Sequence, residues 1–274
     1  MRVATFNLHA GVDGWGRPTR ALDVVKELDA DVLVLPELWR SDEGHDFYTD
    51  LTNTLGVRGI FAPLAHGERV TTGVGTARWQ PRLAHFVGER GLFFDEHRGL
   101  TAAQRKSREL LEHVETGTWG LALLTRLSVE ECQVVSLGRL PREKVQRAFL
   151  VARLNDGTRS FYVLAVHGAH ISHGSHLQYR RINDYVATLA PDVPVLVAGD
   201  FNAWRPLLRL YLPGWRSLAR GRTWPTPRPH SQIDHVLGRG PWRSHQSFTR
   251  DGGSDHLALV CDLELTELHR GALG

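Results

Sequence analysis

Short apolar runs that stop abruptly at polar residues recur along the chain and indicate buried β-strands. Their side chains are mostly β-branched or small, which is typical of strands covered on both faces. Four of these runs cover residues 2–6, 31–36, 161–166 and 195–198. The polar residues that follow them are Asn7, Glu37, His167, Asp200 and Asn202. Because open α/β sheets place their chemistry past the carboxyl ends of strands, these residues are candidates for a functional site.

Helical periodicity follows the first and the third of these runs. Apolar residues at helical spacing predict a helix over residues 20–28, with Thr19 as its N-cap, and another over residues 176–189. Each run, its helix and the next run then form a β-α-β unit, so the chain contains two such halves. Two further helices are predicted over residues 46–55 and 102–114.

Shorter apolar segments predict additional strands between and after the two halves. These strands cover residues 58–62, 120–125, 131–137, 147–154, 233–237 and 257–261. Residues 203–230 are rich in Trp, Pro and Arg, so we predict a loop region there. No Ser- or Gly-rich linker and no block of like charges divides the sequence. We therefore predict one domain over residues 1–274.

Composition narrows the class of protein without indicating a function. The 274 residues are 42% hydrophobic and 23% charged, as in globular proteins with a substantial core. A net charge of +3 permits an anionic partner and does not require one. Two cysteines make neither a disulfide framework nor a zinc cluster, which favours a reducing compartment. The sequence begins without a signal-like leader and has no apolar run of membrane-spanning length, so we expect a cytoplasmic protein. We also predict a monomer.

The polar residues at the strand ends together supply the groups that metal-assisted hydrolysis of a phosphoester requires. Taken singly, each has a plainer explanation as a turn, surface or half-buried residue. Mg²⁺ or Mn²⁺ prefers oxygen ligands, which Glu37 and Asn7 could provide. Asp200 could orient an attacking water and take its proton. Asn202 and a protonated histidine could stabilise the negative charge of the transition state.

A histidine that must stay cationic benefits from a carboxylate partner, and the sequence offers two candidates for that partner. Asp255 directly precedes His256, the second histidine with a place in this constellation. Asp234 lies in the predicted strand over residues 233–237. Sequence spacing does not distinguish between these two carboxylates.

Four motifs occur in the order found in one protein family. They are Asn7 after the first strand, Glu37 after the second, Gly199-Asp200-Phe201-Asn202, and Ser254-Asp255-His256 near the C-terminus. Further matches are residues 119–126, 163–167, 223–225 and 233–236. Over residues 2–263 the sequence resembles the endonuclease/exonuclease/phosphatase family, which has the DNase I-like fold. The resemblance implies a four-layered α/β/β/α sandwich, in which two mixed sheets pack face to face with helices outside.

The resemblance also implies which residues bind the metal. By motif position, Glu37 would be the chief ligand, helped by Asn7 and Asp255. The family usually has Gln before this glutamate, whereas this chain has Pro36. The glutamate itself is retained, but the neighbouring residue that would support it is Pro36 and not Gln.

Catalytic roles follow from the same motifs. Asp200 would orient or deprotonate the water, Asn202 would hold the phosphate, and His256 would contact the scissile phosphate. Asp255 belongs to the same final motif. His167 would be the other catalytic histidine, with Asp234 as the candidate partner that fixes it.

Two parts of the chain leave the resemblance incomplete. The stretch after the middle strand contains both His167 and His170; we prefer His167 because it directly ends the strand, with His170 as the fallback. Residues 77–116 form a family-variable insertion that maps to no known substrate loop, and residues 265–274 form a tail.

The leading hypothesis is a Mg²⁺- or Mn²⁺-dependent phosphodiesterase in which water attacks in line with the leaving group. No Ser or Cys lies among the candidate residues, so we expect no covalent intermediate. Five adjacent Trp/Arg pairs suit a phosphate backbone with stacked bases and favour a nuclease-like substrate, with DNA or RNA as the partner. Packing of Trp under arginine stems is the simpler explanation of the same pairs.

Three alternatives stay open at this point. The loops could hold an inositol phosphate or a phospholipid head group, or the enzyme could be a phosphomonoesterase on a small sugar or lipid phosphate. A non-catalytic binding module on the same scaffold is the alternative from another class. Inactive members typically lose the metal Glu, the Asp of Gly-Asp-x-Asn or the final His, and all three are present here.

Overall fold

The computed structural model describes residues 1–13, 18–44, 46–72, 112–143 and 145–266. Its strands form two six-stranded mixed sheets. The first sheet contains β1 (Arg2–Thr5), β2 (Val32–Ser41), β3 (Arg58–Thr72), β4 (Glu112–Thr125), β11 (Trp242–Asp251) and β12 (Leu257–Leu265). The second contains β5 (Ser128–Gly138), β6 (Arg147–Asn155), β7 (Ser160–His167), β8 (Val195–Asp200), β9 (Arg216–Ser217) and β10 (Asp234–Arg239).

Each sheet is built around one parallel pair of strands that a helix connects. The strand orders are β11-β12-β1-β2-β4-β3 and β5-β6-β7-β8-β10-β9. Helix α1 (Ala21–Glu27) joins the parallel strands β1 and β2, and α4 (His176–Ala187) joins the parallel strands β7 and β8. The two predicted β-α-β halves are therefore present, one in each sheet. The carboxyl ends of each parallel pair share one edge of their sheet, where the candidate polar residues lie.

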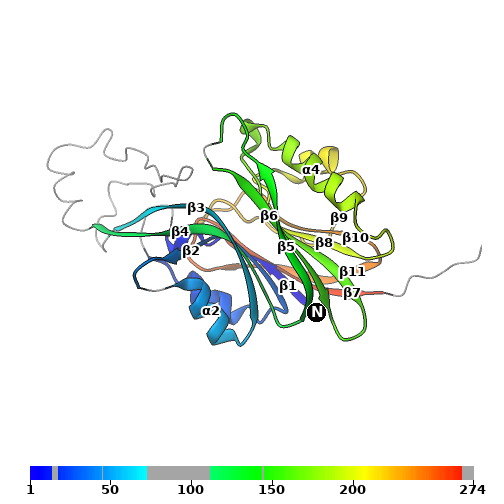
Figure 1. Ribbon diagram of the computed structural model, residues 1–274, viewed down its shortest axis with the longest axis horizontal. Coiled ribbons are helices and arrows are strands. Elements are labelled where there is room, and N and C mark those ends of the chain that lie inside the picture. The colour runs from blue at the N-terminus through cyan, green and yellow to red at the C-terminus, as the bar shows by residue number, and fades with distance from the viewer. Residues whose placement is uncertain (14–17, 45, 73–111, 144, 267–274) are drawn as a thin grey trace, which may run out of the picture.

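Helices cover the outer faces of the two sheets. Helix α2 (Phe47–Leu55) lies with α1 on the first sheet, and α5 (Arg205–Tyr211) lies with α4 on the second. Two short 3₁₀ helices, η1 (His9–Gly11) and η3 (Ile171–His173), follow β1 and β7. Figure 1 shows α2 and α4 on opposite sides of the strands. The layers are thus helix, sheet, sheet and helix, and the predicted four-layered α/β/β/α sandwich is confirmed.

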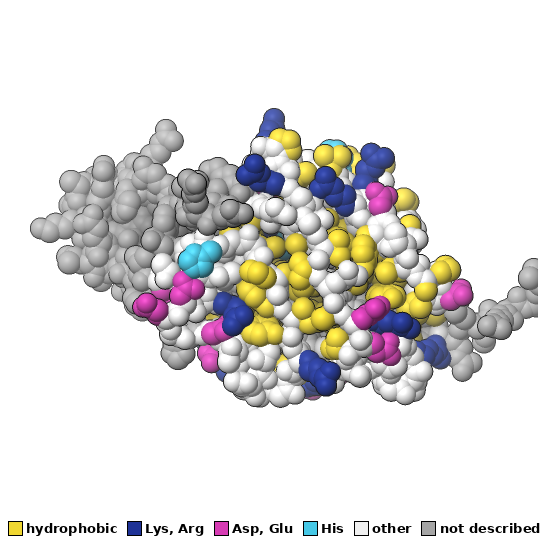
Figure 2. Space-filling model, viewed as in Figure 1, with side chains coloured by type: hydrophobic (Ala, Val, Ile, Leu, Met, Phe, Trp, Pro, Cys, Tyr) yellow, Lys and Arg dark blue, Asp and Glu magenta, His cyan; other side chains and the backbone are white. Residues whose placement is uncertain are grey.

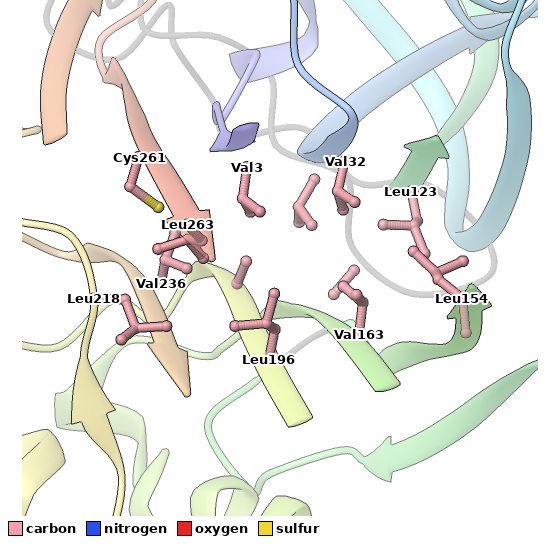
Figure 3. Close-up of a cluster of buried hydrophobic side chains, with 14 of the residues drawn as sticks. Val3, Val32, Leu123, Leu154, Val163, Leu196, Leu218, Val236, Cys261 and Leu263 are labelled. Carbon is pink, nitrogen blue, oxygen red and sulfur yellow. The ribbon is translucent and has the colours of Figure 1, made fainter. Parts of the chain in front are cut away.

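A central apolar core holds the two sheets together. Val3 and Val32 of the first sheet face Val163 and Leu196 of the second, and all four are fully buried (Figure 3). Separate apolar clusters lie under α1 and α2 and under α4 and α5. Both faces of the central strands are therefore buried, which explains why these strands appear in the sequence as continuous apolar runs.

The edge strand β5 contributes less to this core than the strands beside it. Most of its residues are exposed, and Val134 keeps 51% of its surface accessible. Figure 2 shows apolar atoms over the middle of this face of the molecule, where β5 and β6 lie in Figure 1.

Three sequence predictions need correction. The helix predicted over 102–114 does not extend to 114, because residues 112–114 begin β4 and pair with the end of β3. The rest of that helix, residues 102–111, lies outside the described residues, and so do residues 77–111 of the predicted insertion. The predicted strand over 58–62 is part of the longer β3. The predicted loop region 203–230 contains α5 and β9, because Leu208 and Leu212 at helical spacing pack into the apolar layer under α4.

Strand β11 was not predicted at all, although it is ten residues long. Only Trp242 among its residues is buried, and the remainder are exposed or half-buried. An edge strand with so few apolar side chains carries little periodic signal in the sequence. Backbone pairing with β12 decides its conformation instead.

Gly199 is required by the close approach of β7 and β8 immediately before Asp200. Its φ is +142°, and a Cβ at this position would lie 1.9 Å from the carbonyl oxygen of Val166. A side chain would therefore force the two strands apart at the edge where the candidate residues lie.

We predict that Gly199→Ala lowers the free energy of unfolding by about 3 kcal/mol, since overpacking adds to backbone strain. Gly157→Ala is the matched control, because Gly157 also has a positive φ of +95° and a Cβ added there would meet nothing within 4 Å. That control is expected to lose only about 1 kcal/mol. Urea unfolding followed by circular dichroism measures both, and equal losses would contradict the steric argument.

Candidate active site

Asp200 lies at the centre of a row of polar side chains across the second sheet. In the strand register, Asp200 is opposite His167 of β7 on one side and Asp234 of β10 on the other. All three residues are buried. The sheet therefore gathers two carboxylates and an imidazole at one end of three adjacent strands.

The first sheet contributes Glu37 and Asn7 to the same place. Glu37 lies at a β-bulge in β2 and has a φ of 56°. A β-bulge interrupts the regular alternation of side chains between the two faces of a strand and so changes the direction of the side chain. The Nδ2 atom of Asn7 donates to Glu37 Oε1 and to Asp200 Oδ2, both at 3.0 Å. One amide group thus joins carboxylates from the two sheets.

Pro36 does not disturb the position of Glu37. Its carbonyl oxygen accepts a hydrogen bond from the Leu8 N–H at 3.0 Å, which ties β2 to the segment after β1. Besides the bond from Asn7, Glu37 Oε2 accepts one from Trp119 Nε1 at 3.4 Å. Glu37 is therefore held by side chains from the segment after β1 and from β4.

The carboxylate partner of His256 is Asp234. His256 Nδ1 lies 2.8 Å from Asp234 Oδ2, and its Nε2 lies 3.8 Å from Asp200 Oδ2. The pairing of Asp234 with His167 that the resemblance implied is wrong. Those two residues flank Asp200 on opposite sides, two strand spacings or about 10 Å apart. His256, which directly precedes β12, reaches Asp234 from the facing sheet instead.

His256 carries a positive charge because carboxylates surround it. Burial by itself would lower the pKa of His256, but Asp234, Asp255 and Asp200 outweigh it and raise that pKa well above 6.5. Burial raises the pKa of Asp200 to about 7, and Asp234 adds to the rise. The His256 cation and hydrogen bonds from Asn202 and Asn7 act in the opposite direction. Asp200 is thus a carboxyl group that changes protonation near neutral pH.

His167 is held in the opposite protonation state from His256. Burial lowers the pKa of His167 well below 6.5, and the Arg147 guanidinium lowers it further, against the effect of the Glu37 carboxylate. His167 Nε2 lies 3.5 Å from Glu37 Oε1 and 3.9 Å from Asp200 Oδ2. A neutral imidazole and a cationic one therefore lie on the two sides of Asp200.

The turn after β8 positions Asn202. The Asp200 Oδ1 atom accepts the Asn202 N–H at 2.7 Å, and Asn202 has a left-handed φ of 50°. The Asn202 amide Nδ2 donates to the Gly168 carbonyl at 3.1 Å. The segment is thus an Asp/Asn turn as well as a part of the site, since the turn is what holds both side chains at the sheet edge.

Two overlapping groups of side chains could hold a metal ion. Ligand atoms of Glu37, His167 and Asp200 lie within 4.8 Å of one another, and so do those of Asp200, Asp234 and His256. Buried carboxylate oxygens without enough cationic partners suit a hard divalent cation, and Asp234 Oδ1 has no hydrogen-bond partner among the described residues. The carboxylate oxygens of Glu37, Asp200 and Asp234 therefore fit Mg²⁺ or Mn²⁺.

Asn7 and Asp255, the other predicted metal ligands, are placed differently. The Asn7 Oδ1 atom accepts the His9 N–H at 3.0 Å, so its amide nitrogen faces the two carboxylates. The Asp255 carboxylate lies 3.6 Å from His9 Nδ1 and belongs to neither group of possible ligands. Asn7 would have to turn its amide to offer oxygen to an ion, and both roles stay predictions.

The structure separates His167 from its fallback His170. His167 is 1% exposed and lies within the cluster. His170 is exposed, precedes η3 and accepts the Ser172 N–H at its own Nδ1. The middle histidine of the cluster is therefore the residue that directly ends β7.

Sequence reasoning missed several residues that build the site. Trp119, within a matched segment, donates to Glu37, and its ring lies 5.2 Å from the His167 ring. The Arg147 guanidinium lies 5.2 Å from the Trp119 ring. Ser254 Oγ donates to the Asn7 carbonyl at 2.8 Å, and Thr223 Oγ1 accepts the Asp234 N–H at 3.3 Å. Trp119, Ser254 and Thr223 stood inside the matched motifs, whereas nothing in the sequence distinguished Arg147 from other arginines.

The family model described as Endonuclease/Exonuclease/phosphatase family matches residues 4–256. The match spans every residue of the cluster, from Asn7 to His256. The chain therefore belongs to this family, whose members are generally phosphoesterase hydrolases that depend on a divalent metal. No curated protein sequence matches the chain significantly.

Solved structures share the fold at low sequence identity. An endonuclease/exonuclease/phosphatase from Beutenbergia cavernae aligns with a TM-score of 0.65 and 20% identity, covering 97% of this chain and 71% of that one. The human Nocturnin catalytic domain with bound sulfate has a TM-score of 0.60 at 18% identity, covering 97% and 94%. A mannosyl-6-phosphatase from Bacteroides thetaiotaomicron has a TM-score of 0.58 at 14% identity, covering 96% and 99%.

In the part of the chain that the structure describes, every helix is too short or too polar to cross a lipid bilayer.

We predict that Asp234→Asn lowers the pKa of His256, because it removes a hydrogen bond and a negative charge while the burial that disfavours the cation persists. In the wild type, His256 is expected to stay protonated at neutral pH while His167 stays neutral. Nitrogen-detected NMR titration of the imidazoles in EDTA measures both residues. Asp184→Asn, at an exposed carboxylate of α4, is the control and should leave both titrations unchanged. An unaltered His256 titration in Asp234→Asn would contradict the pairing.

Proposed function

We propose that the protein is a divalent-metal-dependent phosphoesterase that hydrolyses phosphodiester bonds by direct attack of water, with a nuclease-like substrate favoured. One observation carries the proposal: the buried Asp200 carboxylate lies 3.8 Å from His256 Nε2 and 3.9 Å from His167 Nε2. The Asn7 amide joins the same carboxylate to Glu37. That arrangement provides a proton acceptor, a positive charge and an oxygen ligand within one buried cluster. The family membership supports the same class of reaction.

Asp200 is the group that takes the proton of the attacking water. A carboxyl group whose pKa is near the working pH is well matched to proton transfer. The Asn202 amide Nδ2 donates to the Gly168 carbonyl and, at 3.3 Å, to Asp200 Oδ2, and it would exchange the second of these bonds for one to a phosphate oxygen. His256 Nε2, on the side of the ring away from Asp234, provides a positive N–H for the charge that develops on the phosphoryl group.

Glu37 would hold the metal ion, with Asn7 as a further ligand after rotation of its amide. When bound, the ion polarises the phosphoryl oxygens and neutralises part of their charge. In the described structure the Asn7 amide donates a hydrogen bond to the Glu37 carboxylate and another to the Asp200 carboxylate. These bonds stabilise the two negative charges, as a bound cation would. The Trp119 N–H keeps Glu37 directed into the cluster in either case.

We predict that the wild type hydrolyses bis-p-nitrophenyl phosphate with Mg²⁺ or Mn²⁺, and that Asp200→Asn and His256→Gln each lower kcat/KM at least about 100-fold. Asp200→Asn keeps the shape of the side chain and removes the proton acceptor, whereas His256→Gln keeps a polar side chain and removes the positive N–H. His170→Gln is the matched control at an exposed histidine and should stay within about twofold of wild type. An inactive wild type with both metals, or undiminished activity in either variant, would contradict the catalytic roles.

The substrate class is tested by a parallel series of substrates. Plasmid DNA and RNA represent the favoured nuclease-like activity, while phosphoinositides and sphingomyelin represent lipid head groups. p-Nitrophenyl phosphate reports phosphomonoesterase activity. Activity on DNA that falls steeply with added salt supports the nuclease interpretation, because contacts with a phosphate backbone release counterions.

We predict that Glu37→Gln weakens Mn²⁺ binding by more than the roughly 10–100-fold that loss of an outer partner of a metal ligand costs. The amide keeps the size of the side chain and loses the charge. Isothermal titration calorimetry with Mn²⁺ alone measures this without any turnover. Trp119→Phe is expected to have a smaller effect in the same direction, because it removes only the N–H that orients Glu37. Equal Mn²⁺ affinity in wild type and Glu37→Gln would contradict this metal site.

A further inference from the structure

The segment between Asn202 and Asp234 has an unusual charge composition. Residues 203–233 contain six arginines and no Asp, Glu or Lys. The segment leaves the site at the turn after β8, forms α5 and β9, and returns to the site at the start of β10. Its two ends therefore adjoin the catalytic cluster, although neither end takes part in the proposed chemistry.

Three parts of this segment, residues 204–209, 221–222 and 230–232, line an open groove with a volume of about 550 Å³. We call it the basic groove; the side chains that matter here are Trp204, Arg205, Arg209, Arg222, His230 and Gln232. None of the described residues that line it is acidic. The groove therefore presents several positive charges and no negative charge.

The three arginines of the basic groove are not engaged elsewhere. Among the described residues, Arg205, Arg209 and Arg222 form no ion pair and no side-chain hydrogen bond. Arg216 of the same segment differs, because it donates to the carbonyl oxygens of Gly240 and Trp242. Arg205 and Arg209 are one turn apart on α5 and lie on the same face of that helix. Uncompensated like charges around one groove attract an anion.

An exposed aromatic ring lies beside these charges. Trp204 is 55% exposed, although Ala203 before it and Leu208 after it are buried. Its backbone is extended, with φ −75° and ψ 149°, and it directly precedes α5. A flat indole next to guanidinium groups is the combination that binds a nucleic-acid strand, through stacking on a base and contact with phosphate. An inositol phosphate would use the arginines and leave the indole without a planar partner.

Chain connectivity keeps the basic groove close to the scissile phosphate. Trp204 is two residues beyond Asn202, and Gln232 is two residues before Asp234. Two residues of extended chain span at most about 7 Å. Arg222 adjoins Thr223, whose hydroxyl accepts the Asp234 N–H. A strand with one phosphate at Asn202 and His256 thus has its adjoining nucleotide at the groove.

We propose that the basic groove binds the phosphate and base of the nucleotide that adjoins the scissile phosphate in a single-stranded nucleic acid. Arg205, Arg209 and Arg222 contact phosphate, and Trp204 stacks on a base. The location of the scissile phosphate rests on the proposed function, but binding in the groove requires no turnover. The groove can therefore be tested in EDTA, where metal-dependent hydrolysis cannot occur.

Fluorescence anisotropy with fluorescein-labelled oligothymidylate in EDTA measures this binding on the full-length protein. The combined variant Arg205→Ser, Arg209→Ser and Arg222→Ser is expected to bind at least tenfold more weakly. The slope of log Kd against log salt concentration should be smaller than in the wild type by about 2, because three phosphate contacts are lost and each contributes about 0.7 on a single strand. Trp204→Ala should weaken binding about fivefold or more, through loss of one stacked base.

Arg180→Ser is the matched control, because Arg180 is an exposed arginine on α4 that does not line the groove. It should change Kd less than twofold. Thermal unfolding followed by circular dichroism establishes that each variant is folded. Arg222→Ser and Trp204→Ala lie outside α5, so they keep the proposal testable if the combined variant fails to fold.

Two results would overturn the proposal. One is wild-type affinity for oligothymidylate in folded Arg222→Ser and Trp204→Ala. The other is that these variants bind oligothymidylate as the wild type does and lose affinity only for vesicles that contain phosphatidylinositol bisphosphate. That result would indicate that the groove binds a lipid head group. Loss of oligothymidylate affinity in both variants supports the proposal even if bis-p-nitrophenyl phosphate is not hydrolysed, so failure of the proposed function and failure of the groove are distinguishable.

Discussion

Burial of the Asp200 carboxylate between two sheets is the constraint on which the site depends. A buried carboxylate is costly unless donors or positive charges compensate it. Here the compensation comes from both sheets: Asn7 and His256 approach from the first, while the Asn202 N–H comes from the turn of the second. The face-to-face packing of the sheets is therefore also what makes the carboxylate tolerable. Any change that separates the sheets at this edge leaves Asp200 without its partners.

The two β-α-β halves explain why the polar residues meet. Each half places polar side chains at the carboxyl ends of its parallel strands, Asn7 and Glu37 in one and His167 and Asp200 in the other. Packing the halves together gives the two histidines of the site different environments. His256 is surrounded by carboxylates and stays cationic, whereas His167 is buried near the Arg147 guanidinium and stays neutral. Two identical side chains can thus serve different functions within one cluster.

Much of the fold could be predicted because its central strands are buried on both faces and are recognisable as apolar runs. The failures have specific causes. Strand β11 shows no run because only Trp242 is buried, and α5 was hidden by the Trp, Pro and Arg residues around two buried leucines. The residues of the site could be predicted from polar positions at strand ends and from motif order. Arg147 could not, because its importance lies in its contact with Trp119 and its effect on His167.

The sequence by itself determined the buried strands, the two β-α-β halves and the identities of the polar residues that end them. These are local properties, since the period of apolar residues and the residue after a strand are read along the chain. Only the tertiary structure decided that Asp234 pairs with His256 and not with His167, because strand register and sheet packing set which charges meet. It also placed the Asp200 carboxylate beside His167, Asp234 and His256 in one cluster. The same packing brings Trp204 around one groove with three arginines that form no ion pair with any residue the structure describes, although Arg222 is 17 residues from Arg205 along the chain.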